Sequence, residues 1–355
     1  MKNFKKFISI IMIMAMIFAI TACSEQKAAT NEKPDEQPTG ETPANESQTS
    51  NIGEYSWSLG TDSPEDTVTH KYAVKFAEEV KALSGGKINV QVYSNGTLGG
   101  DREMLESIKG GNIQFVVQTT APQVNFMPKL AVFDIPNAYA TIDEVRKAVD
   151  NESFIKSINS VYEDAGYHLM AYADQGFRVM STNKKIESIN DFKGQKIRTM
   201  ENANHIAYWK ALGANPTPMA FAEVYIGLQQ GTIDAQENPY EVVVSAKFYE
   251  QQKYVIKTNH IPHLLSLITS SELYNGLNDA EKAIVDEAAV NAKAYAREQA
   301  DSRVSDRISI IESNGAEIVE VNAETFKAMQ EAVQPVYGSI KEQVGEELVN
   351  AYLGK

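Results

Sequence analysis

The feature that most constrains the fold is the run of residues 278–314, which contains neither glycine nor proline. Asn278 stands where a helix would begin, and Glu281 follows at the spacing of a reciprocal helix cap. A helix of this length would span roughly 50 Å. Neither lobe of a two-lobed chain would be that large, so we expect the helix to cross both. A coiled coil is the alternative, but Ala and charged residues occupy positions where a steady heptad needs large apolar side chains.

The beginning of the chain has the layout of a secretory leader. Three lysines within the first six residues precede an apolar run over residues 7–20, and small residues then lead to Cys23. This pattern predicts a signal peptide over residues 1–22, and its end resembles the lipobox of bacterial lipoproteins. A transmembrane helix is the alternative, but the run is shorter than the ~20 apolar residues that a span needs.

Cys23 is the only cysteine of the chain. We expect it to be lipidated, which would anchor the protein at the outer face of the cell membrane and would explain a lone cysteine in an exported chain. No disulfide and no cysteine-based metal site can then form within the chain. Residues 24–51 contain no Val, Ile, Leu, Met or aromatic residue. Such a segment cannot bury enough apolar surface to offset the entropy of ordering, so we interpret residues 23–53 as the lipidated cysteine and a disordered tether.

The remaining chain is large and acidic. About 300 residues suffice for two lobes with sizeable cores. The full chain has a formal net charge of −14, and loss of the leader removes three lysines and no acidic residue, which leaves −17. This charge disfavours a nucleic-acid partner and a basic membrane-binding face. It does not exclude an anionic ligand, because net charge describes the whole surface and not one pocket.

Strand-like and helix-like segments alternate along the chain, which predicts an α/β architecture. Two lobes are expected: residues 54–174 with about 264–303 in lobe I, and residues 175–263 with about 304–355 in lobe II. In lobe I we expect strands over 55–60, 87–93 and 113–117 and helices over 68–83 and 102–109. Near the boundary between the lobes we expect strands over 167–173 and 177–181. Lobe II further includes expected strands over 196–200 and 214–219, and helices over 205–212 and 222–231.

Catalytic signatures are absent from the sequence. It contains no HExxH, CxxC, GxSxG or phosphate-binding glycine loop. Of the five histidines, His260 and His263 are near each other, but two histidines without a third ligand make a weak metal site, and we interpret them as loop or surface residues. The sequence gives no reason to choose any pair of carboxylates as an acid and base.

The segment from residue 176 to residue 239 contains five motifs in order: GxR, DFKGxKIR, LGAxPxPMxFxEVY, GLQxG and DxQENP. Together they closely resemble the DctP-type substrate-binding proteins of tripartite ATP-independent periplasmic (TRAP) transporters. The first-lobe stretch GGDREMLESIKGGNIQF, residues 99–115, is also similar to this family. The resemblance extends over essentially all of residues 54–355.

The resemblance implies a periplasmic-binding-protein-like fold, in which two α/β lobes enclose a central ligand cleft and a long helix spans both. Members of the family are not enzymes and need no cofactor. They bind a small organic acid outside the membrane and deliver it to a permease driven by a sodium gradient. In Gram-positive bacteria such proteins are lipid-anchored, which agrees with Cys23. We expect this chain to act as a monomer.

The family's ligand-binding residues carry over by motif. Arg198 in KIR matches the arginine that clamps the ligand carboxylate, and Arg178 in GFR matches a second arginine near the same group. Asn238 in ENP matches an amide that contacts the carboxylate, and Phe221 matches an aromatic that packs against the ligand body. The chemistry fits, because a planar guanidinium presents two parallel donors to two carboxylate oxygens. The competing interpretations are a surface ion pair for Arg198, a core residue for Phe221 and a turn residue for Asn238.

The first lobe is expected to set specificity through Asp62, Ser63, Asp101, Gln118 and Thr119. Polar groups of this kind favour a ligand rich in hydroxyl groups, such as a uronate or a related sugar acid. A C4-dicarboxylate is the alternative, with Arg178 binding the second carboxylate. Two further function classes are a lipoprotein hydrolase, which would need the nucleophile elbow or metal set that is missing, and an adhesin, which the strand–helix repetition disfavours.

Overall fold

The computed structural model describes residues 51–355. The predicted signal peptide, the lipidation of Cys23 and residues 24–50 of the predicted tether lie outside the described residues. Within the described chain, no helix combines the length and the apolar character that crossing a membrane requires.

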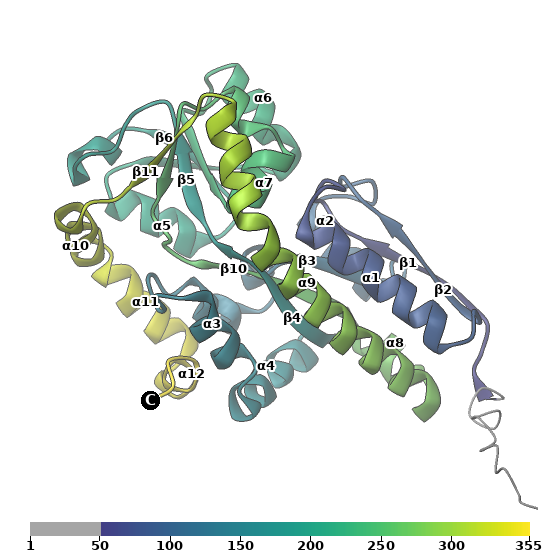
Figure 1. Ribbon diagram of the computed structural model, residues 1–355. Coiled ribbons are helices and arrows are strands. Elements are labelled where there is room, and N and C mark those ends of the chain that lie inside the picture. The colour runs from purple at the N-terminus through teal and green to yellow at the C-terminus, as the bar shows by residue number, and fades with distance from the viewer. Residues whose placement is uncertain (1–50) are drawn as a thin grey trace, which may run out of the picture. The chain divides into compact units, whose positions relative to one another are not determined.

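The described residues form two mixed α/β lobes, each built on its own sheet (Figure 1). This confirms the expected two-lobed α/β architecture. In the first sheet the strand order is β2-β1-β3-β10-β4. Strand β1 pairs in parallel with β2 and β3, whereas β10 is antiparallel to both of its neighbours. The bounds are β1 Tyr55–Gly60, β2 Ile88–Tyr93, β3 Phe115–Thr119, β4 Tyr167–Phe177 and β10 Pro262–Ser270.

The second sheet has the order β11-β9-β5-β8-β6-β7. Strand β6 is parallel to β7 and β8, β11 is parallel to β9, and β5 runs antiparallel to β8 and β9. The bounds are β5 Val179–Thr182, β6 Lys196–Thr199, β7 Asn215–Pro218, β8 Ala235–Asn238, β9 Tyr254–Lys257 and β11 Glu317–Glu320.

Helices cover both sheets and connect the strands. The helices that precede β4 in the chain are α1 Val68–Leu83, α2 Asp101–Lys109, α3 Ile142–Val149 and α4 Glu152–Asp164, with the 3-10 helices η2 Ala121–Asn125 and η3 Pro128–Asp134. Those that follow are η4 Ile189–Phe192, α5 Ala203–Ala211, η5 Phe221–Glu223, α6 Val224–Gln229, α7 Tyr240–Ser245, η6 Phe248–Glu250, α8 Ser271–Gly276, α9 Asp279–Ser313, α10 Ala323–Ala332, α11 Gln334–Val344 and α12 Glu346–Tyr352.

Helix α9 is the long helix expected from the sequence, and it contacts both lobes (Figure 1). Asn278 caps its N-terminus, and Glu281 completes the reciprocal cap. A row of fully buried alanines, including Ala288, Ala292 and Ala296, faces α1 and β4. Small side chains let the helix approach these elements closely, which explains why this helix has alanines where a coiled coil would have larger residues. Further along, Arg307 bonds Glu241 of α7 in the second lobe.

Two strand connections accompany α9 between the lobes. Strand β4 of the first sheet continues through Arg178 into β5 of the second, and β9 returns through residues 258–261 into β10. The two connections are joined by a backbone hydrogen bond from Arg178 N to Ile261 O. Residues on these connections are therefore held between the sheets, at the base of the space that separates the lobes.

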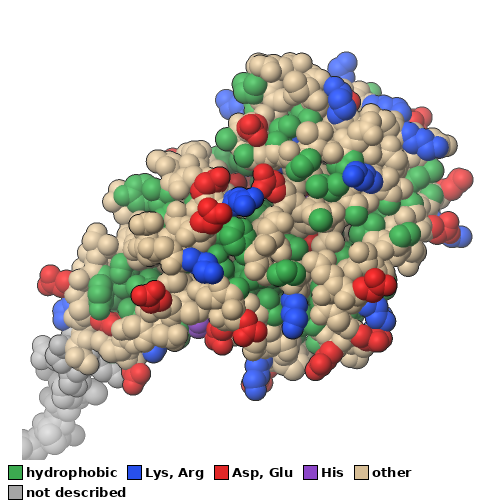
Figure 2. Space-filling view, turned by 180° about the vertical axis from the view of Figure 1, so that it is seen from behind, with side chains coloured by type: hydrophobic (Ala, Val, Ile, Leu, Met, Phe, Trp, Pro, Cys, Tyr) green, Lys and Arg blue, Asp and Glu red, His purple; other side chains and the backbone are tan. Residues whose placement is uncertain are grey.

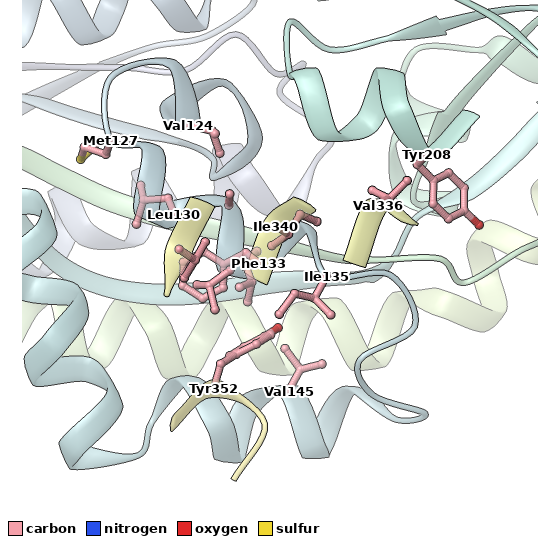
Figure 3. Close-up of a cluster of buried hydrophobic side chains, with 14 of the residues drawn as sticks. Val124, Met127, Leu130, Phe133, Ile135, Val145, Tyr208, Val336, Ile340 and Tyr352 are labelled. Carbon is pink, nitrogen blue, oxygen red and sulfur yellow. The ribbon is translucent and has the colours of Figure 1, made fainter. Parts of the chain in front are cut away.

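The last helices pack beneath the first lobe. Helix α11 contacts η3 and also α5, and α12 contacts η3 and α4. Figure 3 shows Phe133 of η3 beside Ile340 of α11 and Tyr352 of α12. The C-terminal helices thus share one core with elements of both lobes, and the assignment of residues 304–355 to lobe II stays a prediction.

Most predicted elements are present, with shifts that have a local cause. The strand expected over residues 113–117 is Phe115–Thr119, and the strand expected to end at residue 173 continues to Phe177. The sequence hides this extension because Asp174, Gln175 and Gly176 lack strand-like apolar alternation. Pairing with β10 continues to Asp174 and resumes at Phe177, with a register shift between them. Within this irregularity Gly176 takes a positive φ of 79° that a side chain would disfavour.

The surface agrees with the acidic composition without being uniformly acidic. On the face shown in Figure 2, acidic and basic side chains are interspersed, and apolar side chains occur in small groups between them. Of the large apolar residues described, Ile226, Val290 and Val304 are the exposed ones. Charge of one sign does not dominate this face.

Candidate functional site

A narrow polar cavity lies where the first and second sheets face each other. The volume of this inner cavity is about 30 Å³. It adjoins a wider hollow of about 440 Å³, and five residues line both: Asp62, Asp101, Arg198, Met200 and Phe221. The position agrees with the rule that ligands of open α/β sheets bind at the carboxyl ends of strands. The inner cavity is lined by Asp62, Ser63, Thr69, Asp101, Thr119, Arg198, Met200, Phe221, Asn238, Val242, His263 and Leu265.

Arg198 forms one wall of this cavity. It lies on β6 and is only 2% exposed. Its Nε and Nη2 donate to the carbonyl oxygen of Met219, at 3.0 and 2.8 Å. Burial lowers the pKa of the guanidinium to about 10, so it stays protonated at neutral pH. Glu237, Asp62 and Asp101 attract this charge from a distance, but the hydrogen bonds of the guanidinium within residues 51–355 go to the Met219 carbonyl alone, although an arginine offers five N–H donors. The backbone carbonyl therefore orients a cation that keeps donors available to an anion.

Asp62 and Asp101 form a carboxyl pair on the facing wall. Burial raises the pKa of both groups, and the neighbouring Asp62 raises that of Asp101 further. Ser63 Oγ donates to Asp62 Oδ1 at 3.1 Å, whereas Asp101 Oδ1 is buried and has no hydrogen-bond partner within the described residues. Two adjacent buried carboxyls cannot both be charged cheaply. The pair therefore provides hydrogen-bond acceptors and repels a further negative charge.

Arg178, in contrast, is fully occupied by protein groups. It is 1% exposed, and its Nε bonds Glu237 Oε2 while its Nη2 donates to Glu237 Oε1 at 2.9 Å. The same Nη2 donates to Asn238 Oδ1 at 3.1 Å, and Nη1 contacts His263 Nδ1. Arg178 is not among the residues that line the cavity. The structure thus places this arginine behind the site, where it orients two residues that do line it.

Asn238 lines the cavity at the end of β8. Its Oδ1 accepts from Arg178, and its Nδ2 donates to Gln236 Oε1 at 2.7 Å. Because the oxygen is engaged by Arg178, the amide cannot flip, and the second N–H of Nδ2 remains a donor. The following Pro239 has φ −63° and starts α7, so the backbone that presents the amide is stiff.

The interpretation of His260 and His263 as loop or surface residues is wrong. They are 1% and 6% exposed, respectively. His260 Nε2 lies 3.0 Å from Glu237 Oε2, and His263 lines the cavity. Burial lowers the pKa of both imidazoles. The error arose because the sequence shows only a short polar stretch, whereas in the fold that stretch is the connection enclosed between the sheets. The apolar run HLLSLITS that follows, which forms β10, was the available signal.

Glu237 and Asp134 hold a third histidine beneath the site. His205 Nε2 lies 3.1 Å from Asp134 Oδ1, and its Nδ1 lies 3.8 Å from Glu237 Oε1. Burial would lower the pKa of His205, but the two carboxylates outweigh it and raise this pKa to about 9. Asp134 also accepts from Asn202 and Asn204 at the start of α5. These bonds join η3 to α5 and so connect elements on the two sides of the base.

The other sequence-predicted residues divide between lining and non-lining positions. Thr119 and Phe221 line the cavity, whereas Gln118 does not. Successive side chains of a strand point to opposite faces, so Gln118 and Thr119 at the end of β3 cannot both face the ligand space. Gln118 is 1% exposed and has no hydrogen-bond partner for its side chain within residues 51–355. Lining residues without a prediction are Thr69, Met200, Val242, His263 and Leu265.

The chain matches a known family over most of its length. The family model of the bacterial extracellular solute-binding proteins, family 7, covers residues 59–343. The chain belongs to this family. It is a DctP-type solute-binding protein of the TRAP class, as the sequence motifs predict. No group of three His, Cys, Asp or Glu side chains suited to hold a metal ion occurs in residues 51–355.

Three similar proteins are named for small acids or were solved with them. A TRAP solute-binding protein from Polaromonas sp. JS666, solved with D-erythronate, is 32% identical with a TM-score of 0.80, over 84% of this chain and 98% of that one. A sugar acid-binding protein from Advenella mimigardefordensis, solved with galactonate, is 29% identical with a TM-score of 0.82, over 86% and 98%. A C4-dicarboxylate-binding periplasmic protein from Rhodobacter capsulatus is 31% identical, over 81% of this chain and 86% of that protein.

The raised pKa of His205 predicts a pH-dependent stability. A histidine whose pKa is higher in the folded state stabilises the protein fully below its unfolded value near 6.5, and this contribution is lost as pH rises through about 9. We expect the free energy of unfolding, measured with urea, to fall by up to about 3 kcal/mol between pH 6 and pH 9.5 from this group. His205→Gln keeps a polar contact with Asp134 but cannot titrate, so it should flatten this fall. An unchanged pH profile in His205→Gln would contradict the assignment.

Proposed function

We propose that this family 7 protein captures a sugar acid, of the aldonate or uronate kind, and delivers it to a sodium-driven TRAP permease. The single observation that carries the ligand class is the division of the cavity into a donor wall and an acceptor wall. Arg198 and Asn238 offer N–H donors on one side, and Asp62 and Asp101 offer carboxyl acceptors on the other. A ligand with one carboxylate and several hydroxyl groups satisfies both walls.

The carboxylate of the ligand is proposed to bind Arg198. The guanidinium is buried and oriented by the Met219 carbonyl, and it has no salt-bridge partner within the described residues. A ligand carboxylate would accept two parallel N–H bonds from the donors that the Met219 carbonyl leaves available. Asn238 adds a donor from the adjacent strand, and Phe221 offers an apolar face to the carbon chain. Arg178 supports this end indirectly, through its bond to Asn238.

The hydroxyl groups of the ligand are proposed to bind Asp62 and Asp101. Two adjacent buried carboxyls offer oxygens that accept hydrogen bonds from the hydroxyl groups of the ligand. The ligand needs no charged group at that end. A C4-dicarboxylate, which the Rhodobacter relative is named for binding, would instead bring a second negative charge toward the pair. Like charges in a poorly solvated pocket repel strongly, and Arg178 is already neutralised by Glu237. The site therefore favours a sugar acid over a dicarboxylate.

Arg198 is expected to dominate affinity. Arg198→Ala should weaken binding of galactonate or D-erythronate by roughly 10²–10³-fold, because it leaves a buried carboxylate unpaired, at a cost of about 3–5 kcal/mol. Arg198→Lys should also bind poorly, since an ammonium cannot contact both oxygens in the same plane. Isothermal titration of the soluble domain, with the melting temperature as a check on folding, measures the change. Wild-type affinity in a folded Arg198→Ala protein would remove Arg198 from the site.

The carboxyl pair is expected to set the choice between sugar acids and dicarboxylates. Replacing both members, Asp62→Asn with Asp101→Asn, removes the negative charge but keeps polar groups of the same size. We expect galactonate to bind about tenfold or more weakly, because hydrogen bonds to charged groups contribute more than neutral ones. Succinate should gain affinity relative to galactonate. Glu201→Gln, at the exposed rim of the wider hollow, is the control. An unchanged ratio of the two affinities in the double variant would refute this role.

The lipid anchor at Cys23 is proposed from the leader pattern, and it would keep the binding domain near its permease. Cys23→Ser should prevent lipid attachment, so the protein should appear in the medium or remain unprocessed. Partitioning into detergent and migration on a gel distinguish the two forms. A variant that partitions and migrates like the wild-type protein would show that Cys23 is not lipidated.

A further inference from the structure

His263 is the second residue of β10 and lines the inner cavity together with Leu265, yet neither the sequence motifs nor the family match gives it a role. Its side chain makes one hydrogen bond within residues 51–355, between Nδ1 and Nη1 of Arg178. A guanidinium carries donors only. His263 Nδ1 must therefore be the acceptor of this bond, which means that Nδ1 carries no proton.

The bond from Arg178 fixes the state of the imidazole. A neutral imidazole without a proton on Nδ1 carries it on Nε2. Burial, together with the positive charge of Arg178, keeps the pKa of His263 well below its usual value, so the ring is neutral at physiological pH. The Nδ1 side of the ring is turned to Arg178, which lies outside the cavity lining, and the opposite side carries the Nε2–H. The cavity thus receives a neutral donor held in one tautomer.

The hydrogen bonds of Arg178 indicate where this Nε2–H donor lies in the cavity. Its Nη1 contacts His263 and its Nη2 donates to Asn238 Oδ1, so the two cavity-lining residues are attached to neighbouring nitrogens of one planar group. Asn238 belongs to the donor wall that is proposed to bind the carboxylate. His263 Nε2–H therefore lies at the same end of the ligand, close to the carbon that follows the carboxylate. Val242 and Leu265 line the cavity nearby without a polar group, whereas Thr119, which pairs with Leu265 across the sheet, is a further polar lining residue.

We propose that His263 recognises an oxygen on the carbon next to the ligand's carboxylate, and so selects 2-hydroxy acids over acids that lack this oxygen. The proposal rests on the proposed function, because it assumes that the carboxylate binds Arg198. A 2-hydroxyl oxygen accepts the Nε2–H bond. An acid without that hydroxyl leaves a buried donor unpaired, which is more costly than the bond itself is favourable.

The test compares pairs of acids that differ only at this carbon. D-Erythronate is paired with 3,4-dihydroxybutanoate, and galactonate with 2-deoxygalactonate. Calorimetric titration at pH 7 of the soluble domain should show that the wild-type protein binds the 2-hydroxy member about tenfold more tightly. In His263→Leu this ratio should fall close to one. In His263→Gln, whose amide can accept from Arg178 and still donate into the cavity, most of the ratio should remain.

The ratio is measured within one variant, so a general loss of stability or of lobe closure affects both members of a pair and cancels. Melting temperatures confirm that each variant is folded. A ratio in His263→Leu equal to that of the wild type overturns the role of His263 and leaves the proposed function intact. A wild-type protein that binds the sugar acids without preferring the 2-hydroxy member has the same consequence. If the wild-type protein binds none of the four acids, the proposed function itself fails.

Discussion

The buried ion pair between Arg178 and Glu237 is the interaction on which the rest of the site depends. Both side chains are at most 1% exposed, and burying two charges costs several kcal/mol per ion unless further hydrogen bonds satisfy them. Here Glu237 also receives bonds from histidines, and Arg178 bonds Asn238 and His263. The pair thus joins the two strand connections to β8 and fixes the orientation of the donors that face the cavity. Removing either partner would leave the other charge buried and would release those donors.

A strongly acidic protein can bind an anion when an arginine lines its pocket and the other charged groups near the pocket are paired or lie on the opposite wall. The one arginine that lines the inner cavity, among the described residues, is oriented by a carbonyl rather than by a carboxylate, so its remaining N–H donors are left for a ligand. The second arginine of the motif is neutralised behind the site. The acidic residues that do line the cavity form a pair on the facing wall, where they select against a second anionic group. Net charge therefore says little about the ligand, whereas the arrangement of three or four buried groups says much.

Much of the fold could be predicted because its signals are local. The capped, glycine-free run of α9, the alternation of β1 and the glycine stops of α1 and α2 depend on near neighbours in the chain. The cavity position of Arg198 and Asn238 was predicted from motif resemblance. Gln118 and Thr119 were predicted together, although adjacent residues of a strand face opposite sides. His263 was missed because its burial arises from a connection between two sheets, which no local pattern reveals.

The sequence by itself determined which chemical groups are available and where regular elements begin and end. It supplied two arginines at strand ends, an asparagine before a proline and a helix long enough to reach both lobes. Only the tertiary structure decided which arginine is free and which is paired, which face of β3 meets the ligand space, and which nitrogen of His263 carries the proton. The physical reason is that pairing, burial and tautomer depend on groups distant in the chain, such as Arg178 with Glu237 and with His263. Such groups come into contact only when the two sheets are assembled.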